Sequence, residues 1–311
     1  MGFVLPTVRF AGLALVVVLL IWAATFIVGR SRRSKRRPAR AEPMPRWALP
    51  HEPALPAIAA DLAQIGDLAV RAASIVGPAN RSHQPGMPRQ DAYRLAQDSA
   101  SEHLIIAVAD GALPGGRPGL GANLATTTVV NDLRRQLDLG IGLERLTAAD
   151  VFGRVAQSMV DGAQLRGISM GSLYTTLVAM VIPTAPTRGG ERTAWLAYLG
   201  HSSAWVNLGS RWQNLTADVT ADTSATLPFQ PELAAAALVD LPPKSVVAIT
   251  TDGLAAAFSK LPQGQSRFAH RWRHPRSIGS FLLDVDFPAD TAGTGALTDD
   301  RTAVIVWCGA A

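Results

Sequence analysis

The stretch Leu104-Ile105-Ile106-Ala107-Val108-Ala109-Asp110-Gly111 is a short apolar run that stops at an acidic residue and a glycine. A continuous apolar run of this length, ended by a turn signal, is typical of a β-strand. The run therefore predicts a strand with a carboxylate held at its end.

Three further acidic motifs lie where an apolar run begins or ends: Arg89-Gln90-Asp91-Ala92, Thr250-Thr251-Asp252-Gly253 and Asp299-Asp300-Arg301-Thr302. Carboxylates at strand ends can converge on one point because the strands fix their positions. Oxygen ligands suit hard divalent cations such as Mg²⁺ or Mn²⁺. Several buried Asp without a cation would repel one another, which raises their pKa values. The four motifs together predict a metal site.

Apolar spacing predicts a strand-dominated domain with inserted helices. Intervals of three and four predict a helix over Gly121 to Leu137, and a Thr147/Asp150 capping-box pattern predicts the start of a second helix that runs to Leu165. Other strands are predicted at Leu68–Val76, Leu173–Ile182, Thr193–Leu199, Ala204–Leu208, Ser245–Ile249 and Ala303–Trp307.

Residues 10–29, FAGLALVVVLLIWAATFIVG, carry no charge over 20 positions. Twenty apolar helical residues span roughly the 30 Å of a bilayer core, so this segment predicts a transmembrane helix. Seven basic residues lie between Arg30 and Arg40, whereas only Arg9 precedes the segment. A cleaved signal peptide has the opposite charge order. The positive-inside rule then predicts a single-pass protein of the cell membrane, with residues 1–9 extracytoplasmic and everything after Gly29 cytoplasmic.

The rest of the chain divides into a linker and one domain. Residues 30–56 are basic and proline-rich, which predicts a semi-extended linker, and residues 57–311 suffice for one large domain. Nine of the 29 Lys and Arg, but two of the 24 Asp and Glu, lie before residue 57, which leaves the domain 20 basic and 22 acidic residues. A domain without basic excess does not indicate nucleic-acid binding. The single cysteine, Cys308, excludes an intrachain disulfide.

The ordered set of motifs resembles the type 2C family of metal-dependent serine/threonine protein phosphatases. The resemblance covers nearly all of residues 67–308 and also includes Gly171-Ser172-Leu173-Tyr174-Thr175-Thr176 and Leu199-Gly200-His201-Ser202. It implies a four-layer α-β-β-α sandwich of two mostly antiparallel sheets flanked by helices, here preceded by one transmembrane helix. It also implies a binuclear metal centre at one edge of the sandwich.

The family pattern implies a set of ligands for two divalent cations, Mg²⁺ or Mn²⁺: Asp91, Asp110 as the bridging residue, the Gly111 carbonyl, Asp252 and Asp299. A water held between two such ions becomes hydroxide near neutral pH and would attack phosphoserine or phosphothreonine. No phosphoenzyme is expected. Cys308 is expected to be an apolar filler and not a nucleophile.

Two departures from the family pattern leave alternatives open. His201 stands where the family has the Asp associated with a third metal, so a third metal is in doubt. Its imidazole could be a ligand, more readily of Mn²⁺ than of Mg²⁺, or it could be a turn residue without a metal role, which the softness of nitrogen favours. Arg81, His83 and Arg89 compete to bind substrate phosphate, and the sequence does not choose among them.

Two functions follow from these residues. An active phosphatase is favoured because all four expected carboxylates are present. The alternative is a pseudophosphatase that binds a phosphoprotein or a regulatory partner without turnover. A short membrane tether raises the effective concentration of neighbours, which predicts substrates on membrane-associated proteins, such as a membrane serine/threonine kinase or its targets.

Overall fold

The computed structural model describes residues 55–83, 86–111, 116–209, 211–217, 224–260, 263–286 and 299–309. One sheet is formed, in spatial order, by β1 (Ile58–Ile65), β2 (Leu68–Ile75), β11 (Arg301–Cys308), β10 (Val246–Thr250), β7 (Ser203–Asn207) and β8 (Trp212–Asn214). The other sheet is formed by β3 (Ala92–Gln97), β4 (His103–Ala109), β5 (Leu177–Pro183), β6 (Arg192–Leu199) and β9 (Ala235–Leu241). All strand pairs are antiparallel.

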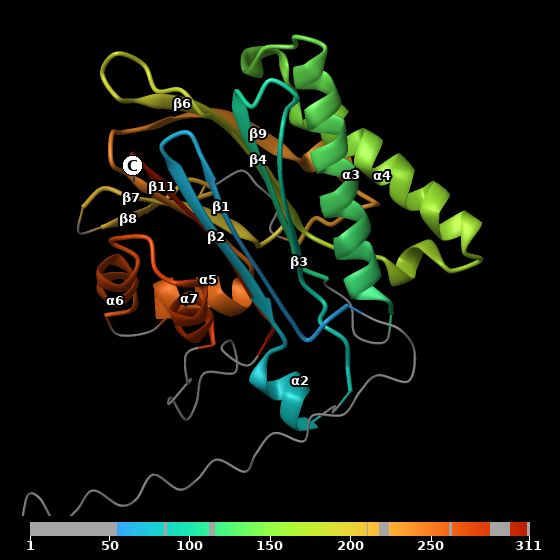
Figure 1. Cartoon of the computed structure of the whole chain (residues 1–311). Helices are drawn as coiled ribbons and strands as arrows, with labels where there is room; N and C mark the ends of the chain where they lie inside the picture. The colour runs from blue at the N-terminus through green and yellow to red at the C-terminus, as the bar shows by residue number, and fades with distance from the viewer. Residues whose placement is uncertain are drawn as a thin grey trace, which may run out of the picture. The chain divides into compact units, whose positions relative to one another are not determined.

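Helices cover the outer face of each sheet (Figure 1). The β3–β9 sheet carries α3 (Pro118–Asp138) and α4 (Ala148–Leu165). The β1–β8 sheet carries α5 (Asp252–Lys260), α6 (Gly264–Arg271) and α7 (Ile278–Val285), while the short α2 (Pro78–His83) follows β2. The predicted α-β-β-α sandwich is therefore confirmed for the domain.

Strand β4 shows why the layers stack in this order. Its even-numbered residues from Leu104 to Val108 lie in the core between the sheets, and its odd-numbered residues from Ile105 to Ala109 pack with α3 and α4. All six side chains are fully buried. Successive strand residues point to opposite faces, so a strand covered on both faces must be apolar throughout. This is the physical reason that its sequence is a continuous run.

Strand β11 plays the same role in the other sheet. Val304 and Val306 face the core between the sheets, whereas Ile305 and Trp307 pack with α5, α6 and α7. Cys308 is also buried, and burial raises the pKa of its thiol. This agrees with the expected role of Cys308 as an apolar filler.

The strand register brings the acidic motifs to one edge of the sandwich. Asp91 directly precedes β3 and Asp110 directly follows β4, and the residues beside them are paired. Asp252 begins α5 just after β10, and Asp299 lies just before β11, which pairs with β10. The link from β6 to β7 crosses between the sheets at the same edge and contains His201.

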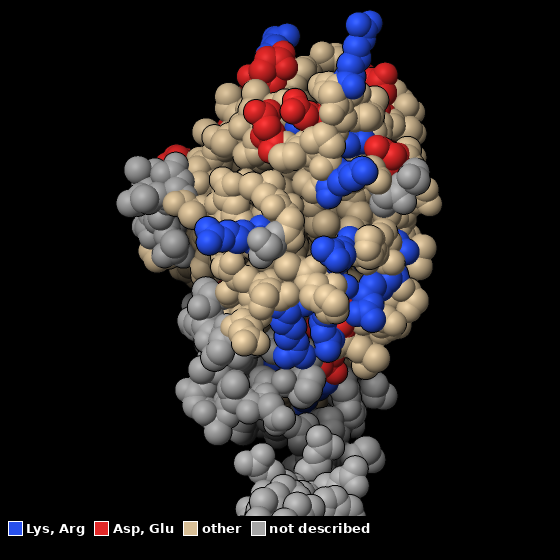
Figure 2. All heavy atoms as spheres, turned by 90° about the vertical axis from the view of Figure 1, so that its left-hand side faces the viewer, with Lys and Arg blue, Asp and Glu red and all other residues tan. Residues whose placement is uncertain are grey.

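Basic side chains gather on the face that carries α6 and α7 (Figure 2). The sequence from α6 to the start of α7 supplies Arg267, Arg271, Arg273 and Arg276. Arg271 and Arg276 both form ion pairs with the buried Asp284 of α7. The Arg271 pair connects α6 to α7, and the Arg276 pair holds the segment before α7 against that helix, so part of this basic surface has a structural role.

Several elements differ from the sequence prediction. The sequence patterns did not predict strands β1, β3, β8 and β9 or helices α2 and α5 to α7. Strands β1 and β9 are edge strands whose side chains are largely exposed or half-buried, so they lack a strong apolar pattern. The strand predicted over residues 173–182 begins at Leu177, because residues before it form a turn and Thr175 makes isolated bridges to Gly111 and Leu227.

Among the described residues, no helix is long and apolar enough to cross a membrane. The transmembrane helix predicted at residues 10–29 lies outside the described residues, as do residues 1–9 and nearly all of the predicted linker.

Candidate metal centre

Hydrogen bonds to the backbone of Asp110 hold this residue in place. Its carbonyl accepts hydrogen bonds from the Thr176 amide at 2.9 Å and from the Thr175 hydroxyl at 2.7 Å. A Cβ added at the neighbouring Gly111 would lie 2.5 Å from the Cβ of Pro118, so only glycine allows α3 to begin this close to the strand end. The Asp110 side chain, only 9% exposed, is therefore fixed at the sheet edge.

Asp91 joins the two sheets at this edge. Its Oδ2 accepts hydrogen bonds from the hydroxyls of Thr251 and Thr302, each at 2.8 Å. Asp91 precedes a strand of one sheet, whereas Thr251 directly follows β10 and Thr302 lies in β11 of the other sheet. No sequence pattern indicates these two threonines as positioning residues, although each lies within three positions of a predicted ligand.

Asp252 and Asp299 complete the predicted carboxylate set. The Asp252 side chain is 45% exposed at the start of α5. The next residue, Gly253, packs so tightly that an added Cβ would lie 2.1 Å from the carbonyl oxygen of Asp300. Asp299 is exposed, and its Oδ1 accepts a hydrogen bond from the Asp300 amide at 2.8 Å.

The neighbouring Asp300 has a different role. Its side chain is buried and accepts hydrogen bonds from the amides of Gly77 and Gln90 and from the Asn80 side chain, at 2.8, 2.6 and 2.9 Å. These bonds fix the segments that lead into α2 and into Asp91. The sequence placed two aspartates side by side and contained no signal that the second one is structural.

The four predicted carboxylates lie close enough for their negative charges to repel one another. Burial raises the pKa of Asp110 well above its ordinary value, and the charges of Asp91, Asp252 and Asp299 raise it further. Burial and the charge of Asp300 raise the pKa of Asp91, against its hydrogen bonds. Partial desolvation also raises the pKa of Asp299, although its side chain reaches solvent, and the charges of Asp252 and Asp300 raise it further. Divalent cations would relieve this repulsion, so the cluster fits a metal centre.

His201 is part of the same cluster. Its Nδ1 lies 3.5 Å from Asp252 Oδ2 and 3.8 Å from Asp110 Oδ2. One ligand atom from each of the three residues lies within 4.8 Å of the other two. His201 Nδ1 and Asp252 Oδ1 are buried atoms that find no hydrogen-bond partner within the described part of the chain. Such atoms are rare in folded proteins, and a cation would satisfy both.

The three candidates for binding substrate phosphate have different surroundings. Arg81 forms two hydrogen bonds with the Asp286 carboxylate at 2.6 and 3.3 Å, which commits its guanidinium to an ion pair. Arg89 is buried, and its Nε donates to the Pro56 carbonyl. Its Nη1 has no hydrogen-bond partner among the residues that the structure describes. His83 ends α2, and its side chain is not among those described. A phosphate-binding role for any of them stays a prediction.

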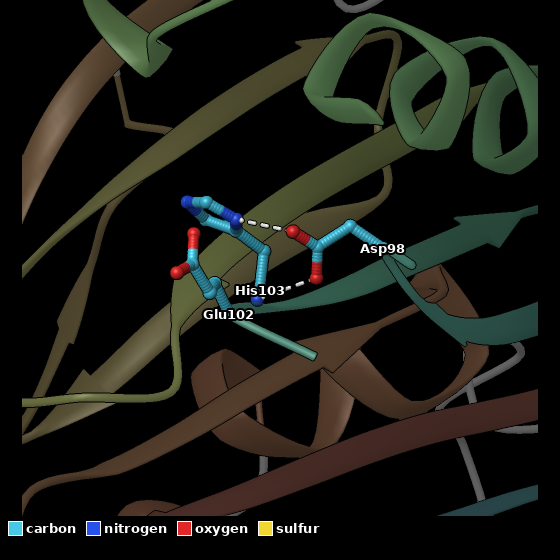
Figure 3. A group of neighbouring side chains, drawn as sticks. All are labelled: Asp98, Glu102 and His103. Atoms are coloured by element: carbon cyan, nitrogen blue, oxygen red, sulfur yellow. Dashed lines mark hydrogen bonds and ion pairs between the residues drawn. The ribbon is translucent and has the colours of Figure 1, made fainter. Parts of the chain in front are cut away.

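A second group of ligand-type side chains, Asp98, Glu102 and His103, lies at the opposite end of β4 (Figure 3). Both oxygens of Asp98 accept hydrogen bonds from His103, from its amide at 2.9 Å and from its Nδ1 at 3.0 Å. Burial tends to raise the pKa of Asp98, but its bonds to His103 bring that pKa below the ordinary value. The Asp98 carboxylate is thus already satisfied within the β3–β4 turn, and we assign this group a structural role.

Comparison with known proteins identifies the family. Residues 79–281 match the family profile described as protein phosphatase 2C. The match covers more than half of the chain, so the chain belongs to the protein phosphatase 2C family. The resemblance seen in the motifs is therefore confirmed, and the chain is a metal-dependent serine/threonine protein phosphatase by family.

Solved structures support the fold. RsbX in complex with magnesium is similar with a TM-score of 0.51 and 13% identity, over 80% of this chain and 99% of that chain. A bacterial serine phosphatase is similar with a TM-score of 0.51 and 12% identity, over 77% of this chain and 97% of that chain. At such low identity the likeness shows the fold alone. No curated protein matches the chain significantly.

Proposed function

We propose that this chain hydrolyses phosphoserine and phosphothreonine in proteins with the help of two divalent cations, Mg²⁺ or Mn²⁺. The cations would be held by the predicted set: Asp91, Asp110, the Gly111 carbonyl, Asp252 and Asp299. The observation that carries the proposal is the convergence of four carboxylates from strand ends of both sheets, with the pKa of Asp110 raised by burial and by the other three. Such a concentration of negative charge is costly unless a cation offsets it.

The residues around the carboxylates supply rigidity. Thr175 and Thr176 hold the backbone of Asp110, while Thr251 and Thr302 orient the carboxylate of Asp91. Rigid positioning matters because a displacement of about 1 Å can reduce a reaction rate 100-fold. Bound cations would lower the pKa of a water and neutralise charge on the substrate phosphate.

Release of phosphate from phosphoserine peptides by the full-length chain, with and without Mn²⁺, tests the proposal. We expect Mn²⁺-dependent hydrolysis that Asp110→Asn abolishes. The matched control is Asp161→Asn, which changes the exposed Asp of the Asp161-Gly162 pair on α4, outside the predicted ligand set, and should leave the rate unchanged. Peptide binding without hydrolysis would instead support the pseudophosphatase alternative. Absence of Mn²⁺ binding would contradict the metal centre itself.

We also propose, from the sequence alone, that residues 10–29 anchor the chain in the cell membrane with the domain in the cytoplasm. The charge difference between the two flanks of this segment supports this orientation. The substrates would then be phosphoproteins at the membrane, such as a membrane serine/threonine kinase or its targets, because a tether raises their effective concentration.

A further inference from the structure

We infer that His201 is a nitrogen ligand of the metal centre and that it makes the centre prefer a transition-metal cation such as Mn²⁺ to Mg²⁺. The inference rests on the proposed function, since it requires that Asp110 and Asp252 hold a divalent cation. It concerns a residue that departs from the family pattern, in which an aspartate stands at this position.

The spacing of the three side chains suits one shared cation. Neighbouring ligands of a small octahedral ion lie about 3 Å apart and opposite ligands about 4.2 Å apart, for metal–ligand bonds of about 2.1 Å. His201 Nδ1 is 3.5 Å from Asp252 Oδ2 and 3.8 Å from Asp110 Oδ2, between these two limits. A cation could therefore bind all three residues after small adjustments of their side chains.

Two polar atoms of this group lack a hydrogen-bond partner among the described residues. These atoms are His201 Nδ1 and Asp252 Oδ1, and both are buried. This distinguishes the group from Asp98, Glu102 and His103, where the imidazole Nδ1 and both Asp98 oxygens are already hydrogen-bonded. A buried polar atom without a partner loses its hydration free energy without compensation. A coordinated cation would supply that compensation.

The loop around His201 holds it in place relative to Asp110. Gly200 has a φ of +85°, and a Cβ added there would lie 2.6 Å from Cγ2 of Thr176. On the other side, the buried hydroxyl of Ser202 is hydrogen-bonded to that of Thr176 at 2.7 Å. Thr176 in turn donates its amide to the Asp110 carbonyl. Both neighbours of His201 thus contact one residue that is itself bonded to Asp110.

The chemistry of imidazole determines which cation the site binds more tightly. Mg²⁺ is a hard cation that prefers oxygen ligands, whereas first-row transition metals accept imidazole nitrogen more readily. Replacing an aspartate by histidine also removes one negative charge from the site. With His201 as a ligand, we expect the affinity for Mg²⁺ to fall more than the affinity for Mn²⁺.

Pulsed EPR of Mn²⁺ bound to the full-length chain tests the inference directly, because a coordinated imidazole couples its ¹⁴N nucleus to the Mn²⁺ electron spin. We expect this coupling in the native chain and its loss in His201→Gln and His201→Asp. The matched control is His103→Gln, which changes the imidazole of the turn group and should keep the coupling. Dissociation constants for Mn²⁺ and Mg²⁺, from calorimetry, provide a second readout.

His201→Asp restores an oxygen ligand, so this variant should still bind Mn²⁺ and should bind Mg²⁺ better than the native chain does. We expect the ratio of the Mg²⁺ to the Mn²⁺ dissociation constant to fall about tenfold or more, since even a second-shell change alters metal affinity by about 10–100-fold. An unchanged ratio would overturn the claim of metal preference.

Other outcomes separate this inference from the proposed function. Mn²⁺-dependent hydrolysis without ¹⁴N coupling in the native chain would overturn the role of His201 and leave the proposed function intact. Coupling that persists in His201→Gln, or that disappears in His103→Gln, would assign the nitrogen to another histidine. Failure of the native chain to bind Mn²⁺ would overturn both.

Discussion

Thr251 illustrates how one hydroxyl supports the candidate metal centre. It donates a hydrogen bond to Asp91 Oδ2 and accepts one from the Thr302 amide at 3.0 Å, and all three residues are buried. Its two bonds therefore connect the strand pair β10–β11 to a predicted ligand of the other sheet. Thr251 therefore supports the candidate metal centre by orienting Asp91, although Thr251 is not itself a predicted ligand.

Thr251→Val should destabilise the chain by about 1–3 kcal/mol, because it leaves the buried Thr302 amide without an acceptor. It should also weaken Mn²⁺ binding, since Asp91 loses one of its two hydroxyl donors. Urea unfolding and calorimetry measure the two effects. Thr193→Val, at an exposed hydroxyl of β6, is the control and should change stability by less than about 0.5 kcal/mol. Equal effects of the two substitutions would contradict the assigned role.

Asp110→Asn should stabilise the metal-free chain while it abolishes activity. The folded-state pKa of Asp110 is raised, so its ionised form destabilises the fold at pH values above that pKa. Stability of the metal-free native chain should therefore rise as the pH falls from neutral towards the ordinary Asp value of about 3.9. Part of this rise should be absent in the variant, because Asn does not titrate.

Melting temperatures in chelator, measured across this pH range, check the prediction. At neutral pH we expect the variant to melt higher by about 2–4 °C per kcal/mol of relieved repulsion. With saturating Mn²⁺ the order should reverse, because only the native chain gains binding free energy. A lower melting temperature for the variant in chelator would show that the Asp110 carboxylate stabilises the metal-free fold.

At the scale of elements, the close contact between α5 and the segment before β11 brings two carboxylate motifs together. Gly253, in the first turn of α5, makes this contact possible because an added Cβ would lie 2.1 Å from the Asp300 carbonyl oxygen. Asp252 precedes this glycine and Asp299 precedes Asp300. The distance between the helix and the strand end therefore sets the distance between two predicted ligands.

Gly253→Ala should separate these elements, with a cost of about 1–3 kcal/mol for overpacking and a loss of Mn²⁺ affinity. The control is Gly279→Ala in α7, where an added Cβ meets no atom of the described residues within 4 Å. That change should stabilise the chain by about 0.4–1 kcal/mol, because alanine has less conformational freedom in the unfolded state. Thermal unfolding and metal titration distinguish the two variants. Normal Mn²⁺ affinity in Gly253→Ala would mean that this contact does not position Asp252.

At the scale of the whole molecule, the two sheets share one site. Asp91 and Asp110 belong to the ends of β3 and β4, whereas Asp252 and Asp299 belong to the β10–β11 pair of the other sheet. His201 lies on the connection between the sheets. Any disturbance that moves one sheet relative to the other should therefore change metal binding.

The proposed membrane anchor gives the prediction at this scale. Deleting residues 1–29 should slow the dephosphorylation of membrane phosphoproteins in cells, because the effective concentration of short-tethered partners can be about millimolar. Phosphoproteomic analysis of cells expressing the native or the shortened chain measures this effect. Hydrolysis of a soluble phosphopeptide by the two purified chains is the control and should be equal. Unchanged rates on membrane proteins would show that the tether does not select substrates.

The sequence by itself determined those strands and helices whose burial produces a local pattern of apolar residues. Strands such as β4, buried on both faces, appear as continuous apolar runs, and the amphipathic helices α3 and α4 appear through their spacing. The motif order was sufficient to recognise the family and its expected ligands. These features are encoded within a few consecutive residues, so they can be read without knowledge of the fold.

Only the tertiary structure decided the roles that depend on distant partners. It showed that Asp300 binds the Gly77 and Gln90 amides beside Asp299, and that His201 faces Asp110 and Asp252. It also revealed the edge strands β1 and β9, whose exposed side chains carry little pattern. In each case the role depends on a contact between residues that strand register and sheet packing bring together. The order of side-chain types along the sequence does not specify how far apart such residues lie in the fold.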